Sequence, residues 1–194
     1  MRRRCRYDLR SGRGSGPGTV VNHLARFDRE EVPVEGGGRC GARSLAKTLP
    51  WLAGLTDAQI RAFVSRGYLQ HADWMREQFD MDPAGRSQEI LLLTEWFTTS
   101  DFVAFAMDQK CDILILEPGM RSSLITFDGR TFTLRYHEAM ERMTDPPHSK
   151  PLAVLGHYHK VHFVATRPLP DNAPRVMKHV ETTGVVMNEV IVID

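Results

Sequence analysis

The chain has 194 residues, of which 42% are hydrophobic and 25% charged, and a formal net charge of +1 at pH 7. This size suits one sizeable core, and the near-zero charge excludes the whole-molecule basic field of a dedicated nucleic-acid binder. The longest apolar runs, such as 113–116 and 190–193, are strand-sized, far below the roughly 18 residues that a membrane span needs. We therefore expect no membrane partner.

The N-terminal region is basic and rich in glycine. Residues 11–18 have almost no apolar content, so they cannot offset the entropy lost on ordering. We predict a disordered basic leader over 1–18 and a single folded domain over 19–194. No apolar stretch typical of a secretory signal follows the first arginines, which predicts a cytoplasmic location in the producing cell or in a host. The leader is a solvated tail or, alternatively, a localisation or nucleic-acid patch.

Helical patterns fill the first half of the chain. A glycine-rich loop over 35–41 leads into apolar residues at helical spacing, so Cys40 lies where a loop enters a helix. Thr56 and Gln59 have the spacing of a capping box, which marks a helix N-terminus. The predicted helices cover 42–51, the run from 56 toward 74, 87–93, and a stretch that starts at 100.

Strand patterns follow residue 110. Asp128-Gly129 is a typical hairpin turn between two of the strands. Helices first and a largely antiparallel sheet afterwards indicate the α+β class. The predicted strands cover 111–116, 122–127, 131–136, 152–155, 161–166 and 185–193.

Cys40 has the sequence context of a nucleophile. A helix N-terminus and a nearby imidazole stabilise a thiolate, and preceding glycines let backbone N–H groups converge as an oxyanion hole. The loop expected to form this hole is Gly37, Gly38 and Arg39. The alternative interpretation is a plain turn before a small buried cysteine.

The other two cysteines have a simpler explanation. Cys5 lies in the predicted leader, and Cys111 begins an apolar strand. The three cysteines share no CxxC or Cys/His spacing, which argues against a disulfide framework or a zinc site. We expect no metal and no cofactor, and at least one free thiol.

A histidine that could serve as the base lies far along the chain from Cys40. Residues 151–165 have the pattern of a strand, a polar turn and a second strand, and His162 lies at the start of that second strand. Cysteine–histidine pairs are usually assembled from such distant segments. His157 is the alternative base, and a metal site made of His157, His159 and His162 is a further alternative.

An ordered set of motifs resembles the OTU (ovarian tumour) family of cysteine proteases. The motifs are residues 32–46 around Cys40; Trp96, Asp101 and the strand 111–116; and the strand 152–155 before His162-Phe163. The resemblance implies a papain-like OTU fold, with helices packed on a central, mostly antiparallel sheet. It also implies a thiol-dependent deubiquitinase with Cys40 as nucleophile and His162 as base. Its partners would be conjugates of ubiquitin or a ubiquitin-like modifier, cleaved after the modifier's C-terminal glycine.

Three positions depart from the family pattern. Gly37 replaces an aspartate, Arg39 an asparagine, and Val164 the acid or amide that orients the histidine in many relatives. The third catalytic residue is therefore unassigned, and the candidates are Asp28, Asp171 and Asn172. Two alternative functions follow: a catalytically inactive module that binds ubiquitin or another partner, or a papain-like protease of another substrate such as a viral polyprotein.

Overall fold

The computed structural model describes residues 23–36, 38–118, 121–144, 150–158 and 162–170. The predicted leader and the predicted strand 185–193 lie outside these ranges. The helical elements are η1 (His23–Phe27), α1 (Cys40–Thr48), η2 (Pro50–Leu52), α2 (Asp57–Gln70), α3 (Ala72–Phe79), α4 (Pro83–Glu89), α5 (Thr99–Gln109) and α6 (Tyr136–Thr144). The strands are β1 (Arg29–Val32), β2 (Asp112–Leu116), β3 (Arg121–Ile125), β4 (Thr131–Arg135), β5 (Leu152–Tyr158) and β6 (His162–Pro168).

One six-stranded sheet organises these elements, in the order β1-β6-β5-β2-β3-β4. Every neighbouring pair is antiparallel except β2 and β5, which run parallel. The first described strand, β1, therefore lies beside the last, β6. Helices packed on a mostly antiparallel sheet confirm the predicted α+β class.

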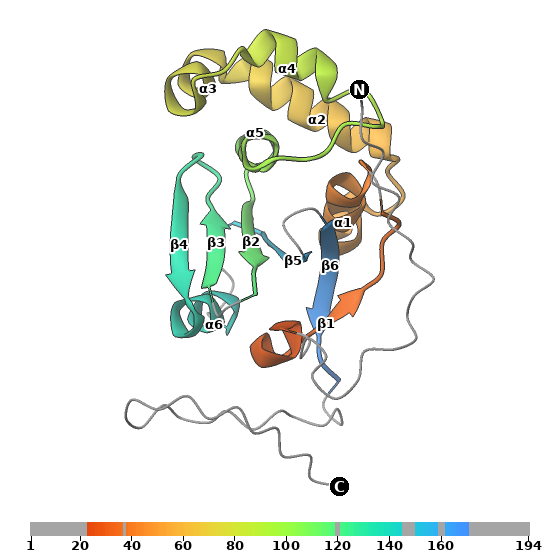
Figure 1. Cartoon of the computed structure of the whole chain (residues 1–194), viewed down its shortest axis with the longest axis vertical. Coiled ribbons are helices and arrows are strands. Elements are labelled where there is room, and N and C mark those ends of the chain that lie inside the picture. The colour runs from red at the N-terminus through yellow and green to blue at the C-terminus, as the bar shows by residue number, and fades with distance from the viewer. Residues whose placement is uncertain (1–22, 37, 119–120, 145–149, 159–161, 171–194) are drawn as a thin grey trace, which may run out of the picture.

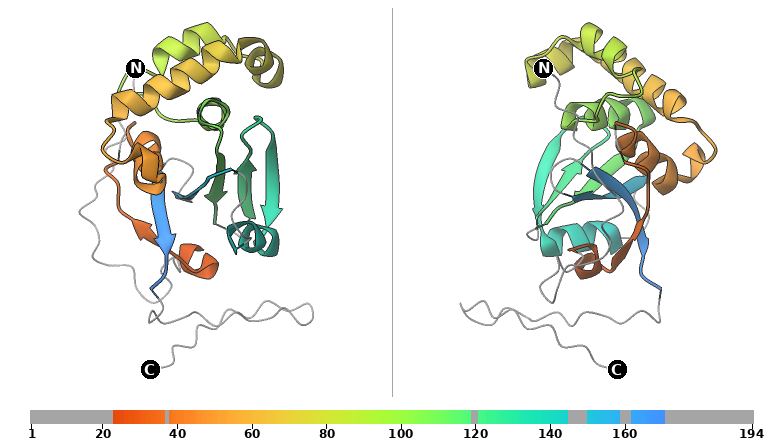
Figure 2. Two further views of the ribbon diagram at one scale, coloured as in Figure 1. Left: turned by 180° about the vertical axis from the view of Figure 1, so that it is seen from behind. Right: turned by 45° about the vertical axis from the view of Figure 1, so that its right-hand side comes forward.

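The helices lie mainly at the two ends of the sheet. Figure 1 shows α2, α3 and α4 as a cap above α5, with α6 and η1 at the opposite end, and both views of Figure 2 agree. Helix α1 packs against β6 and β5, while α5 contacts α2, β2 and β3. All five residues of β2 are buried, which places this strand at the centre of the core. Among the described residues, no helix combines the length and apolar character that a bilayer crossing requires.

Two capping boxes fix the starts of the central helices. The predicted box is confirmed at α2, where the Thr56 backbone N–H donates to Gln59 Oε1 at 2.8 Å and Gln59 N–H donates to Thr56 Oγ1 at 3.3 Å. A second box, between Thr98 and Asp101, starts α5. The helical run toward residue 74 is divided at His71 into α2 and α3.

The prediction of a helix over 87–93 is wrong in its position. Pro83 occupies the first turn of α4, and Asp82 accepts hydrogen bonds from the N–H groups of Ala84 and Gly85, so the helix begins early. It ends at Glu89, and the leucines at 91–93 are exposed in the following loop.

Candidate active site

Cys40 is the first residue of α1 and is buried. The backbone N–H groups of Phe163, Gly41 and Cys40 itself donate toward the sulfur and lower the pKa of the thiol. Burial is the larger effect, and it raises that pKa above the ordinary value of 9.0. The resting thiol is therefore protonated at neutral pH, although it lies among donors suited to a developing negative charge.

His162 is the first residue of β6 and directly precedes Phe163, whose N–H meets the Cys40 sulfur. It pairs across the sheet with Tyr158 of β5. Burial lowers the pKa of His162 below 6.5, while Glu31 raises it and His157 lowers it. A neutral imidazole thus stands one residue from the point where the sulfur contacts β6.

His157 lies on the neighbouring strand, opposite Phe163. Its ring stacks on the Phe163 ring with centroids 4.4 Å apart and planes 5° from parallel, and its Nδ1 lies 3.7 Å from Glu117 Oε1. Since successive strand residues alternate between faces, His157 and His162 lie on opposite faces of the sheet. The alternative base is therefore held against an aromatic ring and a carboxylate.

The other predicted site residues fall in three places. Gly38 and Arg39 immediately precede α1, whereas Gly37, His159, Asp171 and Asn172 lie outside the described residues. Asp28 precedes β1, and its carbonyl accepts from the Leu169 N–H, which places it at the end of β6 remote from His162. In the part of the chain that the structure describes, no three His, Cys, Asp or Glu side chains gather as metal ligands would.

Glu31 is a site residue that the sequence did not indicate. It projects from β1, accepts a hydrogen bond from the Tyr158 hydroxyl, and lies close enough to His162 to raise the pKa of its imidazole. Tyr158 and His162 are cross-strand partners, so the three side chains share one region of the sheet. Only the three-dimensional structure reveals this, because the strand register pairs Glu31 with Thr166 and an acidic residue in an edge strand has no distinctive sequence signal.

The loop before Cys40 is packed against residues 94–97. A Cβ added to Gly38 would lie 2.5 Å from the Thr94 carbonyl oxygen, and one added to Gly41 would lie 2.5 Å from Phe97 Cγ. Neither glycine can be replaced without displacing this segment. Gly38 and Gly41, on either side of Cys40, are thus small because backbone and ring atoms already fill the space.

Apolar side chains are exposed next to this packed loop. Trp96 is 45% exposed, and it follows the exposed leucines at 91–93. Trp51, which follows α1, is 44% exposed. Exposed apolar side chains therefore lie both on the segment that packs against the loop and in η2, after α1.

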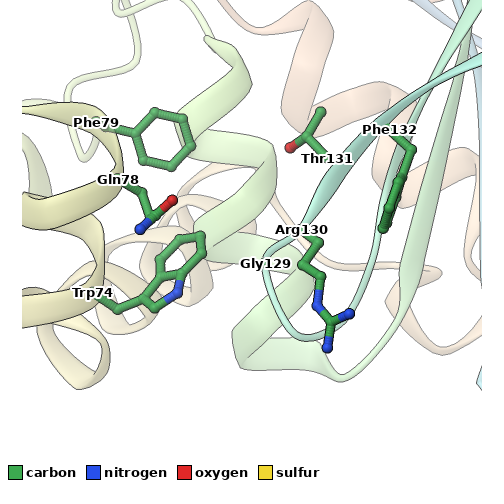
Figure 3. A pocket seen from close by; sticks show the side chains of 7 residues that line it. All are labelled: Trp74, Gln78, Phe79, Gly129, Arg130, Thr131 and Phe132. Atoms are coloured by element: carbon green, nitrogen blue, oxygen red, sulfur yellow. The ribbon is translucent and has the colours of Figure 1, made fainter.

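A separate hollow of about 490 Å³ lies between α3 and the β3–β4 hairpin. Figure 3 shows Trp74 and Phe79 on one side and Gly129, Arg130 and Phe132 on the other. Because β4 and β6 stand near opposite ends of the strand order, this hollow belongs to another part of the sheet than Cys40.

Solved structures of OTU domains share this architecture. The OTU domain of OTUD1 matches with a TM-score of 0.54 and 15% identity, covering 75% of this chain and 89% of that one. An OTU deubiquitinase from Wolbachia pipientis wMel, solved bound to ubiquitin, matches with a TM-score of 0.57 and 11% identity, covering 73% and 96%. The viral OTU domain protease from Taggert virus matches with a TM-score of 0.51 and 17% identity, covering 76% and 83%.

Comparison of the whole sequence with family models and curated proteins does not detect this likeness. No family model matches the chain, and no curated protein matches it. The similarity lies in the arrangement of helices and strands. The chain therefore has the papain-like OTU fold, as the motif order predicted.

Proposed function

We propose that this chain is a cysteine hydrolase that cleaves the bond after the C-terminal glycine of ubiquitin or a ubiquitin-like modifier. The observation that carries the proposal is the contact between the Cys40 sulfur and the N–H of Phe163, the residue next to His162. The ubiquitin in the Wolbachia structure supports the choice of substrate, since that protein has the same fold. Fold by itself leaves the substrate open, so the assignment rests on the site as well.

In this proposal Cys40 is the nucleophile and His162 the base. His162 removes the thiol proton as the sulfur attacks the carbonyl carbon, because both groups are neutral at rest. The carbonyl oxygen, now negative, accepts from backbone N–H groups at the start of α1 and in the glycine-rich loop. The imidazolium then protonates the departing amine, leaving a thioester.

Release of the modifier repeats this chemistry with water. Neutral His162 removes a proton from a water molecule that attacks the thioester carbonyl, and the sulfur leaves and regains its proton from the imidazolium. Glu31 is the positioning residue for His162, in the role that Val164 cannot fill because its side chain is apolar. Its support is the pair of interactions with Tyr158 and His162.

A second candidate function is binding without catalysis. Burial raises the pKa of Cys40, and the position two residues after the histidine is Val164. A site built this way could hold a modifier's C-terminus and leave it intact. The exposed apolar side chains beside the cysteine would then serve a binding surface.

The deciding experiment is reaction with ubiquitin that carries a C-terminal thiol-reactive group. We expect a covalent adduct on Cys40 that is absent in Cys40→Ala, strongly reduced in His162→Ala and retained in His157→Ala. Circular dichroism confirms that each variant is folded. Saturable ubiquitin binding by a folded, unreactive protein would favour the binding module, and reaction with another modifier alone would change the substrate.

A further inference from the structure

Arg61 of α2 is a fully buried cation whose partners are backbone oxygens. Its Nη1 donates to the Ile90 carbonyl at 2.7 Å and its Nη2 to the Glu95 carbonyl at 2.7 Å. Nη2 also donates to the Gly38 carbonyl, two residues before Cys40. One guanidinium therefore joins the helical cap, the 90–97 segment and the nucleophile loop.

An aromatic ring completes this arrangement. The Arg61 guanidinium carbon lies 5.2 Å from the centroid of the Phe97 ring, and that ring also packs against Gly41. Gly38 and Gly41 have no space for a side chain, so the loop and the segment behind it are held together from both sides of Cys40. Three of its partners, Gly38, Glu95 and Phe97, belong to the loop before Cys40 or to the segment packed against it.

We infer that Arg61 is a positioning residue for Cys40. By fixing the Gly38 carbonyl it orients the loop that enters α1, and by fixing Ile90 and Glu95 it holds the surface against which that loop packs. The inference rests on the proposed function for its effect on turnover. The effect of its charge on the Cys40 thiol, however, can be measured without any substrate.

Two physical effects of Arg61 can be separated. The planar guanidinium reaches several carbonyls at fixed angles, which a lysine ammonium on one flexible stem cannot reproduce. Its positive charge also lowers the pKa of the Cys40 thiol, in opposition to burial. Lysine would keep the charge and lose the geometry, whereas methionine would lose both.

The test compares Arg61→Lys and Arg61→Met with a control on the same helix. Arg66→Met is the control, because its guanidinium is 48% exposed and pairs with Asp108 away from the loop. The first readout is the rate of Cys40 alkylation by iodoacetamide across a pH series. Mass spectrometry of the Cys40 peptide keeps Cys5 and Cys111 out of the signal.

For Arg61→Met we expect alkylation to be at least about fivefold slower at pH 8, since a loss of cationic stabilisation raises the thiol pKa. For Arg61→Lys we expect an alkylation profile near that of the parent. Its kcat on a ubiquitin substrate should still fall about tenfold or more, with KM little changed, because a misplaced nucleophile slows the chemical step.

Melting temperatures show whether each variant is folded. If Arg61→Met does not fold, Arg61→Lys decides, and a folded lysine variant with unchanged kcat overturns the inference. Arg61→Met that alkylates like Arg66→Met overturns it as well. If the parent protein turns over no ubiquitin substrate, the proposed function fails, while the alkylation series still tests the role of Arg61.

Discussion

Burial shifts the pKa values of Cys40 and His162 in the directions that disfavour a thiolate–imidazolium ion pair. The thiol pKa rises and the imidazole pKa falls, so both groups are neutral at rest. A thiolate–imidazolium pair would need the reverse order. In the proposed reaction, proton transfer must then accompany attack on the substrate, which makes the orientation of the imidazole decisive for the rate.

Replacement of Glu31 by glutamine tests whether the pKa and orientation of His162 control the rate. Glu31 raises the pKa of His162, so removing its charge should lower that pKa and move the acid limb of kcat/KM to lower pH. The rate on the plateau should fall roughly fivefold, the factor that corresponds to about 1 kcal/mol of lost hydrogen bonding. A pH–rate series on a ubiquitin substrate measures both effects.

The control for this series is Glu30→Gln. Glu30 is the neighbouring residue of β1 and pairs with Arg167, on the other face of the strand. Its loss should leave the acid limb in place. Equal pH–rate profiles of Glu31→Gln and Glu30→Gln would show that Glu31 does not position His162.

At the scale of elements, a buried carboxylate ties α5 to the helical cap. Asp101 accepts from the Tyr68 hydroxyl at 2.8 Å and from Arg86 Nη2 at 2.7 Å, and it caps α5 through the Thr98 N–H at 2.6 Å. It is completely buried. Helices α2, α4 and α5 therefore meet at one charged group.

Asp101→Asn should lower the free energy of unfolding by about 3 kcal/mol, because it neutralises the fully buried carboxylate that pairs most closely with Arg86, whose other carboxylate partners, Glu89 and Glu95, lie 3.4 and 3.6 Å away. Urea denaturation measures the change. Asp73→Asn is the matched control: Asp73 pairs with Arg76 in full exposure, and its loss should cost less than about 0.5 kcal/mol. Similar losses in both variants would show that Asp101 does not anchor the cap.

The elements that the sequence predicted well are those with local signals. A capping box marked α2, a helical pattern marked α5, and apolar runs and a turn marked β2 to β4. Strand β1 was missed because three of its four residues are charged, and α6 was missed because its residues follow the strand pattern of β4 without a break. The position of α4 was predicted wrongly because the leucines at 91–93 suggested a helix over 87–93, whereas Asp82 and Pro83 set its true start.

The residues of the candidate site also divide into those that local sequence signals indicated and those that only the structure revealed. Cys40 and His162 were predicted from a glycine-rich loop and from the start of a strand, which are local features of the sequence. The roles proposed for Glu31 and Arg61 depend on strand register and on carbonyl groups from three segments, which no sequence pattern records.

At the scale of the whole molecule, the core contains a thiol that must stay protonated. Burial, followed by the charge of Asp112, raises the pKa of Cys111 to about 12. The thiol is protonated in both states below pH 9. Above that pH the unfolded chain loses the proton first, so stability falls as the pH rises toward 12.

Between pH 8 and pH 10.5 the parent protein should therefore lose about 2 kcal/mol more stability than Cys111→Ala. Urea titrations of both proteins at the two pH values give this difference, and the constant cost of the smaller side chain cancels. Cys40→Ala, which leaves Cys111 in place, should keep the contribution of Cys111 and lose only the smaller one of Cys40, whose raised pKa is opposed by backbone donors. Equal losses of stability in the parent and Cys111→Ala over this pH range would contradict the raised pKa of Cys111.

The pairing of β1 with β6 has a consequence for the newly made protein. A ribosome releases Cys40 long before His162, and at about 5–20 residues per second the interval lasts on the order of ten seconds. During that time the nascent chain has its sulfur but neither the Phe163 N–H nor the histidine beside it. The proposed hydrolysis therefore requires that the last described strand has emerged and inserted between β1 and β5.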